Sequence, residues 1–332
     1  MNRNKDILIC GYYGFGNLGD ELLLASILEL LLENGIKLHN VAVLSSNKSV
    51  VTNTLGFKTY NRANIFEVIH AMKKSKTLLL GGGGLFQDTT SLRSCFYYWL
   101  IVRLAVLFGT RPWMVGQSIG PLKSSFSKWM TKNALSACLY RGVRDARSLN
   151  ILKEWGLSGV NTSDYVTALS VRKCANKGTK MLINVRQGYK ELSDKVIAIA
   201  TRFATEKDID IIAVAFSDGD LKLIQNYVDK GCLSPSQVVL LRKLSDFEDL
   251  VSDSEFAIGM RYHFLLLSRL AGLSVSGASY DPKVTSLCLE WSIPEMAQEL
   301  DFSKAINNDY IIKKILVIRD SFSFALKKVL GE

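Results

Sequence analysis

The sequence predicts an α/β protein made of two Rossmann-like domains, each a parallel sheet with helices on both faces. Three observations carry this prediction. The chain has 332 residues, more than one hydrophobic core usually holds. Apolar residues make up 48% and charged residues 22%, which is typical of globular proteins. Finally, buried-strand patterns alternate with helical patterns along the whole chain.

The first series of alternating elements occupies the N-terminal half. Apolar runs predict strands at residues 6–10, 41–44, 77–80 and 112–117. Helical periodicity predicts helices at residues 21–34, 67–74, 97–108 and 126–139. Because each strand is followed by a helix, the strands are expected to run parallel.

The second series begins after a polar stretch at residues 170–180, where we place the domain boundary. Strands are predicted at 180–185, 210–216, 238–241, 255–258 and 274–278, and helices at 193–205, 221–228 and 262–270. We therefore expect an N-terminal domain of residues 1–170 and a C-terminal domain of residues 171–332, facing each other across a cleft. A last helix at 310–330 has no strand after it and can pack back on the N-terminal domain.

Composition excludes several classes of protein. No apolar run reaches the roughly 18 residues that a membrane span needs. The N-terminus enters a strand without a leader-like segment, which predicts a cytoplasmic protein. The six cysteines and three histidines show no metal-ligand spacing, so neither a metal nor another cofactor is expected. The net charge of +10 suits phosphorylated substrates or an anionic membrane, whereas no nucleic-acid-binding module is present.

Ligands of open parallel sheets bind outside the carboxyl ends of the strands, so the loops after strands are the candidate sites. The first such loop, residues 11–20, has the Gly-x-Gly-x-x-Gly spacing of dinucleotide-binding turns. However, Ser45–Lys48 supplies no acidic residue for a nicotinamide ribose. Tyr12 and Tyr13 instead favour contact with a sugar. A tight turn without any ligand is the alternative.

Three further loops carry candidate residues. Gly81–Gly84 follows a strand and leaves the backbone uncovered, which suits close approach of a ligand or of neighbouring protein. Asp88 then binds a sugar hydroxyl or caps the next helix. Gly116–Pro121 follows another strand. Arg144 follows a short strand, where it either clamps an anion or pairs with an adjacent carboxylate.

The segment from Gly259 to Lys283 is the richest in candidate residues. A buried strand ends at Gly259 and a helix begins near Arg261, so Arg261 and His263 lie in a first turn that carries free N–H groups. If the strand at 274–278 lies beside it, Lys283 joins them. Three cations at one position would require a strongly anionic ligand, such as a phosphate ester with a carboxylate.

One acidic motif is interpreted as structural. Asp218-Gly-Asp220 has the spacing of a metal-binding Asp-x-Asp pair, but it stands between a strand and a helix. Turn formation and helix capping explain both carboxylates without a metal.

Taken together in order, these loops resemble the polysaccharide pyruvyl transferase family, including the CsaB-like cell-wall enzymes. The resemblance extends from about residue 7 to residue 285. It rests on the segments Gly11–Glu21, Gly81–Asp88, Gln117–Pro121, Val143–Asp145, Met260–His263 and Ser279–Val284. Two departures stand out: Tyr262 replaces a usual leucine, and Ser163-Asp164-Tyr165 replaces an Asp-Pro pattern.

The resemblance implies a two-lobed GT-B-like fold and phosphoenolpyruvate as the donor of a pyruvate ketal. It also implies a sugar acceptor, an N-acetylhexosamine of a lipid-linked cell-wall glycan precursor. The enzyme would reach this acceptor as a peripheral protein at the inner membrane face. The implied donor-binding residues are Arg144, Arg261, Tyr262, His263 and Lys283. Of these, His263, Lys283 and Arg144 are the candidate catalytic residues. The expected acceptor-binding residues are Tyr12, Tyr13, Gly14, Asn17, Asp20, Gly83, Gly84 and Asp88.

In this chemistry, protonation of the methylene carbon of phosphoenolpyruvate creates an oxocarbenium-like neighbour to which two sugar hydroxyls add. His263 is the candidate acid or base because its pKa range lies near working pH. A nucleotide-sugar glycosyltransferase on the same scaffold is the first alternative. A non-catalytic protein that binds glycans or membranes is the second.

Overall fold

The computed structural model describes residues 3–47, 57–89, 92–174, 178–297, 300–304 and 306–331. Lys48 of the segment Ser45–Lys48, and residues 175–177 of the expected domain boundary, lie outside these ranges. Contacts divide the chain into two compact units. Unit 1 comprises Met1–Phe15, Leu23–Ala168 and Lys313–Glu332, and unit 2 comprises Gly16–Leu22 and Leu169–Ile312. Residues 16–22 are thus grouped with unit 2, and the last helix from Lys313 onward is grouped with unit 1, as its expected return to the N-terminal domain allows.

Unit 1 is built on a seven-stranded sheet with the order β3-β2-β1-β4-β5-β6-β7. All paired strands are parallel, as the alternation of strands and helices predicts. The strands are β1 (Lys5–Cys10), β2 (Val41–Ser45), β3 (Lys58–Asn61), β4 (Ser75–Phe86), β5 (Arg111–Ile119), β6 (Arg141–Val143) and β7 (Val160–Asn161).

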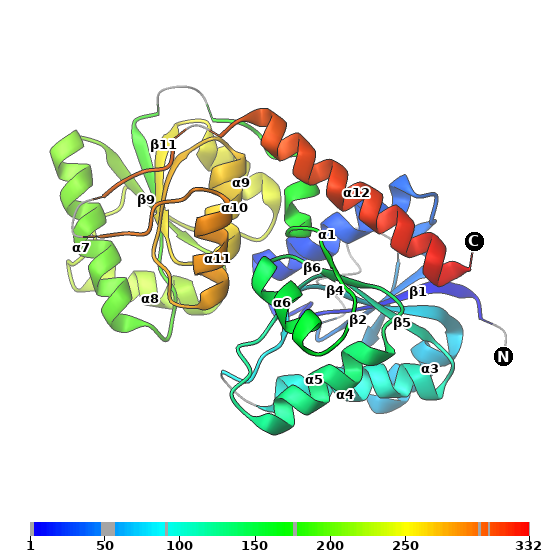
Figure 1. The fold of residues 1–332 in the computed structure, drawn as a ribbon. Coiled ribbons are helices and arrows are strands. Elements are labelled where there is room, and N and C mark those ends of the chain that lie inside the picture. The colour runs from blue at the N-terminus through cyan, green and yellow to red at the C-terminus, as the bar shows by residue number, and fades with distance from the viewer. Residues whose placement is uncertain are drawn as a thin grey trace. The chain divides into compact units, whose positions relative to one another are not determined.

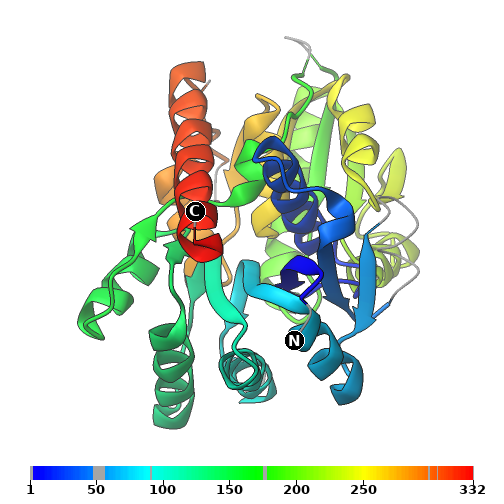
Figure 2. The ribbon, with the colours of Figure 1, turned by 90° about the vertical axis from the view of Figure 1, so that its right-hand side faces the viewer.

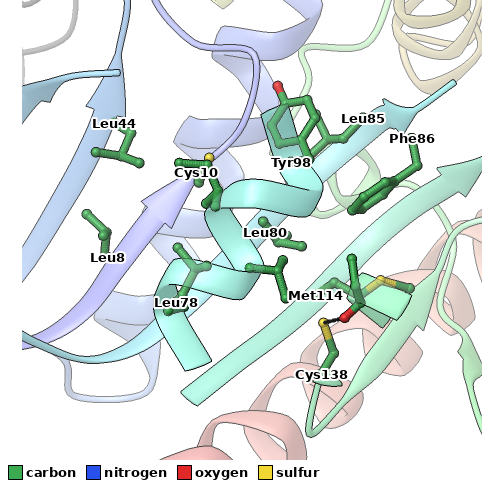
Figure 3. Packing of buried hydrophobic residues seen from close by; sticks show 14 of the residues in the cluster. Leu8, Cys10, Leu44, Leu78, Leu80, Leu85, Phe86, Tyr98, Met114 and Cys138 are labelled. Atoms are coloured by element: carbon green, nitrogen blue, oxygen red, sulfur yellow. Dashed lines mark hydrogen bonds between the residues drawn. The ribbon is translucent and has the colours of Figure 1, made fainter. Parts of the chain in front are cut away.

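Helices cover both faces of this sheet (Figure 1). They are α1 (Leu18–Glu33), α3 (Ile65–Lys74), α4 (Leu92–Leu107), α5 (Ser125–Ala137), α6 (Ala146–Glu154) and α12 (Asn308–Leu330). A cluster of fully buried side chains fills the space between the sheet and α3, α4, α5 and α6. Figure 3 shows Leu8, Leu78 and Leu80 of the central strands, which belong to the same buried cluster as Tyr98 of α4. Their burial removes apolar surface from water and fixes which face of each helix points inward.

The glycines expected in a loop at Gly81–Gly84 lie inside strand β4, which continues to Phe86. The strand accommodates them through positive φ angles at Gly82 and Gly83 and a register shift against β5. A Cβ on Gly81 would lie 2.3 Å from the hydroxyl of Tyr13, and one on Gly82 would lie 2.7 Å from Leu23. These two glycines are therefore required by neighbouring side chains. Gln117 and Ser118, also expected in a loop, lie inside β5.

Unit 2 has a five-stranded parallel sheet with the order β10-β9-β8-β11-β12. Its strands are β8 (Lys180–Asn184), β9 (Asp210–Ala215), β10 (Gln237–Leu240), β11 (Ser254–Gly259) and β12 (Ser274–Gly277). Its helices are α7 (Lys190–Lys207), α8 (Asp218–Asp229), α9 (Leu244–Val251), α10 (Tyr262–Leu270) and α11 (Pro282–Glu290). The prediction of a second parallel α/β domain is confirmed.

The C-terminal helix α12 is one uninterrupted rod (Figure 2). From Lys313 onward it belongs to unit 1. Phe322 is fully buried there, with its ring 5.6 Å from that of Trp113 and 6.0 Å from that of Tyr165. This contact anchors the end of the chain to the sheet of unit 1.

Replacing Phe322 with alanine should lower the free energy of unfolding by about 3–5 kcal/mol, because it leaves a cavity against two buried rings. Denaturant unfolding measures this loss. Phe324→Ala on the same helix is the control, because the Phe324 ring is 62% exposed. That variant should lose less than about 1 kcal/mol. Equal losses in the two variants would show that α12 is not anchored through Phe322.

Candidate active site

The parallel pairing of β11 with β12 brings two helix starts together at one edge of the unit 2 sheet. Gly259, the last residue of β11, is in register with Gly277, the last residue of β12. Helix α10 begins three residues after Gly259, and α11 begins at Pro282. The expected adjacency of the loop carrying Lys283 to the turn carrying Arg261 and His263 is therefore confirmed.

Arg261 is held at the N-cap position of α10 by its backbone and its side chain. Its backbone N–H donates to Oδ1 of Asn184, over 3.0 Å. Its guanidinium donates from Nε and Nη2 to the two carboxylate oxygens of Asp220, over 2.9 and 2.7 Å, and from Nη2 to Ser217. Among the described residues, no acceptor binds Nη1. The Asp220 pair thus fixes the guanidinium and leaves one amino group for a ligand.

Asp220 is the site residue that the sequence analysis assigned to structure. Its side chain is fully buried, so its charge requires a partner, and Arg261 supplies it. The N-cap of α8 is Ser217, which accepts from the Asp220 N–H, so Asp220 has no capping role. Asp218 pairs instead with Arg242, over 2.7 Å. Its position after strand β9 could have identified Asp220 as a site residue from the sequence.

His263 lies in the first turn of α10 with Gly19 packed directly against its ring. A Cβ on Gly19 would lie 2.0 Å from Nδ1 of His263, which no side chain could tolerate. The ring of Tyr262 meets the imidazole edge-on, with 5.1 Å between centroids. Tyr262 itself is buried. Gly19 belongs to the segment Gly16–Leu22, which is part of unit 2, so this contact lies within one unit.

Asp20 faces the cations of this site. Burial raises the pKa of its carboxyl group, whereas the charges of His263, Lys283 and Arg261 and a hydrogen bond from Asn17 oppose that rise. The side-chain amide of Asn17 donates to Oδ2 of Asp20. Both residues were expected to bind the acceptor, but the structure places Asp20 with the donor-side residues His263 and Lys283.

Lys283 lies in the first turn of α11, after the N-cap Asp281. Asp281 accepts from the backbone N–H of Lys283, over 2.9 Å, and its carboxylate lies 3.8 Å from Nζ. This ion pair is long, so Nζ can turn toward a ligand while it stays close to Asp281. The side chain is 19% exposed.

The three cations are therefore not a bare positive cluster. Asp220 faces Arg261, Asp281 faces Lys283, and Asp20 faces His263. Asp20 and Asp220 come from segments distant in sequence, whereas Asp281 lies two residues before Lys283. The expectation that this site takes a strongly anionic ligand stays a prediction. What the arrangement offers is three oriented donors whose charges are already balanced.

Arg186 is a further cation at this edge that sequence analysis missed. It follows β8 and donates to the hydroxyl of Tyr280, with its guanidinium 4.4 Å from the Tyr280 ring centroid. Burial raises the pKa of Tyr280, and Arg186 and Arg261 oppose that rise. The position of Arg186 directly after a buried strand could have identified it.

Arg144 lies in unit 1 and is almost fully buried. Its Nη1 donates to Asp164 over 2.7 Å, and its Nε donates to Ser118 over 2.7 Å. Of the two roles considered for Arg144, the structure contains the ion pair with a carboxylate. Its partner Asp164 stands in the segment 163–165 that departs from the family pattern.

Among the expected acceptor residues, two have clear structural roles. Tyr13 is buried, and its hydroxyl donates to the carbonyl of Gly81 over 2.8 Å. Asp88 accepts from the backbone N–H groups of Lys123 and Ser124 and so orders the start of α5. Burial would raise the pKa of Asp88, but these N–H donors lower it below the ordinary value.

Tyr12, another expected acceptor residue, belongs to an aromatic cluster in unit 1. Tyr12 and Phe15 stack with centroids 4.1 Å apart, and both rings are nearly half exposed. The guanidinium of Arg62 lies 5.2 Å from the Phe15 centroid and 4.3 Å from that of Tyr97. Gly14 has a positive φ angle, while a Cβ on Gly84 would meet open space. Sequence analysis identified Tyr12 and missed Phe15 and Arg62.

A family model described as polysaccharide pyruvyl transferase matches residues 17–282. The chain belongs to the polysaccharide pyruvyl transferase family. The match covers the segment with Asn17 and Asp20 and extends to Pro282, at the start of α11. The chain is therefore a transferase of this family, and the resemblance inferred from its loops is confirmed at the family level. No curated protein matches the chain.

Solved structures share the fold. The UDP-GlcNAc 2-epimerase from Methanocaldococcus jannaschii has a TM-score of 0.58 at 10% identity, covering 95% of this chain and 93% of that one. The S. aureus MnaA–UDP co-structure has a TM-score of 0.53 at 12% identity, covering 82% and 79%. Acinetobacter baumannii MurG has a TM-score of 0.52 at 12% identity, covering 99% and 95%. The GT-B-like fold expected for this pyruvyl transferase family member is confirmed.

The described residues of this family member contain neither a metal-binding cluster nor a helix that could span a membrane. No group of three or more His, Cys, Asp or Glu residues is arranged there to hold a metal ion. The helices in the described ranges are each too short or too polar to traverse a bilayer.

Replacing Asp20 with asparagine should raise the melting temperature at neutral pH. Burial raises the folded-state pKa of Asp20, so its ionisation costs free energy once the pH exceeds the unfolded pKa of about 3.9. The advantage of Asp20→Asn over wild type should therefore shrink as the pH falls toward about 4. Thermal unfolding from about pH 4 to pH 8 measures it.

Asp320→Asn is the control, because Asp320 is exposed on α12. Its melting temperature should follow that of wild type across the pH range. A lower melting temperature of Asp20→Asn at neutral pH would show that the attraction to the three cations outweighs burial.

Proposed function

We propose that this protein transfers the pyruvyl group of phosphoenolpyruvate to a sugar, forming a pyruvate ketal and releasing phosphate. The acceptor we propose is an N-acetylhexosamine of a lipid-linked cell-wall glycan precursor, at the inner face of the membrane. The family match supports the reaction class. The observation that carries the donor assignment is His263, fixed by Gly19 in the first turn of α10 and surrounded by Asp20, Arg261 and Lys283.

The donor's chemistry defines what the site must supply. A proton adds to the methylene carbon of phosphoenolpyruvate, and the adjacent carbon becomes an oxocarbenium-like centre. One sugar hydroxyl adds to that carbon and loses its proton, phosphate leaves, and a second hydroxyl adds and loses its proton. The net result is a ketal and free phosphate, so the site needs a group that can hold and release a proton.

His263 fits this role because imidazole changes its charge near neutral pH. Asp20 is the carboxylate that stabilises the imidazolium after His263 takes a proton from a hydroxyl. Gly19 leaves no room for the ring to move on the Nδ1 side. A fixed ring supports a faster reaction than a mobile one, because it does not have to be oriented during the reaction.

The phosphate and carboxylate groups of phosphoenolpyruvate match the hydrogen-bond donors around His263. The Nη1 group of Arg261 is oriented by Asp220 and suits one carboxylate or phosphate oxygen. Nζ of Lys283 and the N–H groups at the start of α10 suit the others. Because the charges of the cations are balanced by carboxylates, phosphate can leave the site after reaction without leaving uncompensated cations behind.

For the acceptor, the stacked rings of Tyr12 and Phe15 are the best candidate surface. Sugar rings present C–H groups that pack on aromatic faces, and these two faces are nearly half exposed. Arg62 anchors the rings, through its contact with Phe15 and its hydrogen bond to the carbonyl of Gly11. A Cβ on Gly84 would meet open space, whereas one on Gly14 would lie 2.2 Å from the hydroxyl of Ser45, so only Gly84 leaves its backbone open to a ligand.

Replacing His263 with alanine should lower the turnover number for phosphate release from phosphoenolpyruvate by about 100-fold or more, as expected for loss of a general acid or base. A coupled phosphate assay over a panel of synthetic lipid-linked disaccharides measures it. His39→Ala is the control, because His39 is exposed in unit 1. Near-normal turnover of a folded His263→Ala protein would exclude His263 from the chemistry.

Replacing Gly19 with alanine should impair turnover by displacing the imidazole, since the new methyl group would overlap Nδ1. We expect a loss of at least about tenfold in turnover number, with a 1 Å shift sufficient to cause it. Gly35→Ala is the control for backbone strain, because Gly35 has a φ of +78° but nothing lies within 4 Å of a Cβ there, so this variant should keep its turnover number. Full activity of Gly19→Ala would mean that the ring is free to relocate.

A nucleotide-sugar glycosyltransferase is the competing function, because solved structures with this fold carry UDP or act on UDP-GlcNAc by their titles. A thermal-shift comparison separates the two. Our proposal predicts that phosphoenolpyruvate raises the melting temperature and UDP does not. The reverse result would favour the glycosyltransferase.

A further inference from the structure

Helices α4 and α5 lie side by side on unit 1 and carry a continuous row of aromatic rings on their outer side (Figure 1). The ring of Phe96 lies 5.8 Å from Trp99, Trp99 lies 5.9 Å from Trp129, and Trp129 stacks on Phe126 at 5.7 Å. Phe96, Phe126 and Trp129 are each about half exposed. Trp99 also donates to Asn133 and so ties the two helices together.

Three of the four rings in this row, Phe96, Phe126 and Trp129, are about half exposed, whereas Trp99 packs against the hydrophobic core of unit 1. The inward side of α4 contributes Cys95, Tyr98, Ile101, Val102 and Ala105, all of them buried. The outward stripe repeats at helical spacing through Leu92, Phe96, Trp99, Arg103 and Leu107. Leu107 is 73% exposed. Helix α4 is thus apolar on its inner face and also largely apolar on its outer face, which a helix facing only water would not be.

The charges around the row all have one sign. Between Asp88 and Asp145 the sequence contains no Asp or Glu, although the overall composition includes 31 acidic residues. Over the same interval it contains Arg93, Arg103, Arg111, Lys123, Lys128, Lys132, Arg141 and Arg144. Arg103, Lys128 and Lys132 are exposed on the two helices, and in the described part of the chain none of them pairs with a carboxylate. We call the exposed side of α4 and α5, with Lys123, the α4–α5 face.

We propose that the α4–α5 face binds the surface of an anionic lipid bilayer, with its aromatic rings at the headgroup level and its basic side chains against lipid phosphates. Tryptophan prefers this interface because its ring is apolar and its N–H is polar. Lysine and arginine are attracted by anionic headgroups. This inference deepens the proposed function and rests on its location at the inner face of the membrane, because it assigns the surface of unit 1 that contacts the lipid.

A second copy of the chain fits the α4–α5 face less well. A symmetric dimer through this face would bring Lys128 and Lys132 of one copy toward the same basic residues of the other. The face has no carboxylate to compensate them. Charge complementarity therefore favours an anionic surface over self-association.

Vesicle co-sedimentation tests the proposal on the full-length protein. Wild type should bind vesicles of phosphatidylcholine mixed with phosphatidylglycerol, and should bind vesicles of phosphatidylcholine alone far more weakly. Lys128→Glu/Lys132→Glu should weaken binding to the mixed vesicles by about tenfold or more. Phe126→Ser/Trp129→Ser should also weaken it, and raised salt should weaken wild-type binding.

Matched controls keep the result specific to this face. Lys207→Glu/Lys222→Glu changes the net charge equally, on exposed positions of α7 and α8 in unit 2. Phe66→Ser removes a ring that is 79% exposed on α3 of unit 1. Both controls should bind vesicles nearly as wild type does. Circular dichroism should show that every variant is folded.

Three outcomes would overturn the proposal. One is wild-type binding that does not depend on phosphatidylglycerol. Another is equal loss of binding in the face variants and in their controls. The third is an absence of vesicle binding together with a dimer that Phe126→Ser/Trp129→Ser dissociates. Phosphate release with a water-soluble acceptor should be unchanged in all these variants, so failure of the lipid proposal can be distinguished from failure of the proposed reaction.

Discussion

The parallel pairing of β11 with β12 is the constraint on which the candidate site depends. Because the two strands end in register, the starts of α10 and α11 must lie at the same edge of the sheet. His263 and Lys283 are separated along the sequence yet both act on the carboxyl of Asp20. Neither helix propensity nor local sequence would bring them together without this pairing. Gly19 then completes the site, because its missing side chain admits the imidazole.

Carboxylates decide what these cations can do. The carboxylate of Asp220 accepts from Nε and Nη2 of Arg261. The guanidinium is therefore fixed, and Nη1 is the amino group directed toward a ligand. Asp281 stays near Lys283 at a longer distance, which leaves that side chain freer to move. Asp20 faces His263 from a different segment of the chain. Under the proposed function, this balance of charge lets the site bind an anionic donor through oriented hydrogen bonds and still release phosphate.

Some glycines of unit 1 are required by close packing and others border open space, and only the structure distinguishes the two kinds. Gly81 and Gly82 make room for Tyr13 and Leu23, whereas Gly84 borders open space. Tyr12 and Phe15 stack outward while Tyr13, between them, is buried. On its outer helices, the same unit carries aromatic rings and basic residues together. The surface proposed for the sugar acceptor and the face proposed to bind lipid thus both belong to unit 1.

The sequence by itself determined the two parallel sheets and the helix order, and it identified Arg261, His263 and Lys283 as candidates, because strand patterns and positions after strands are local properties. It also determined the family, through motifs in order. It did not determine the roles of Asp20, Asp220 and Arg62, since a partner distant in sequence leaves no local pattern. The assignment of residues 16–22 to unit 2 likewise required the tertiary structure, whereas a last helix with no strand after it already allowed residues 313–332 to pack on unit 1. Pairing of charges and close packing are decided by which surfaces meet, and only the folded chain specifies that.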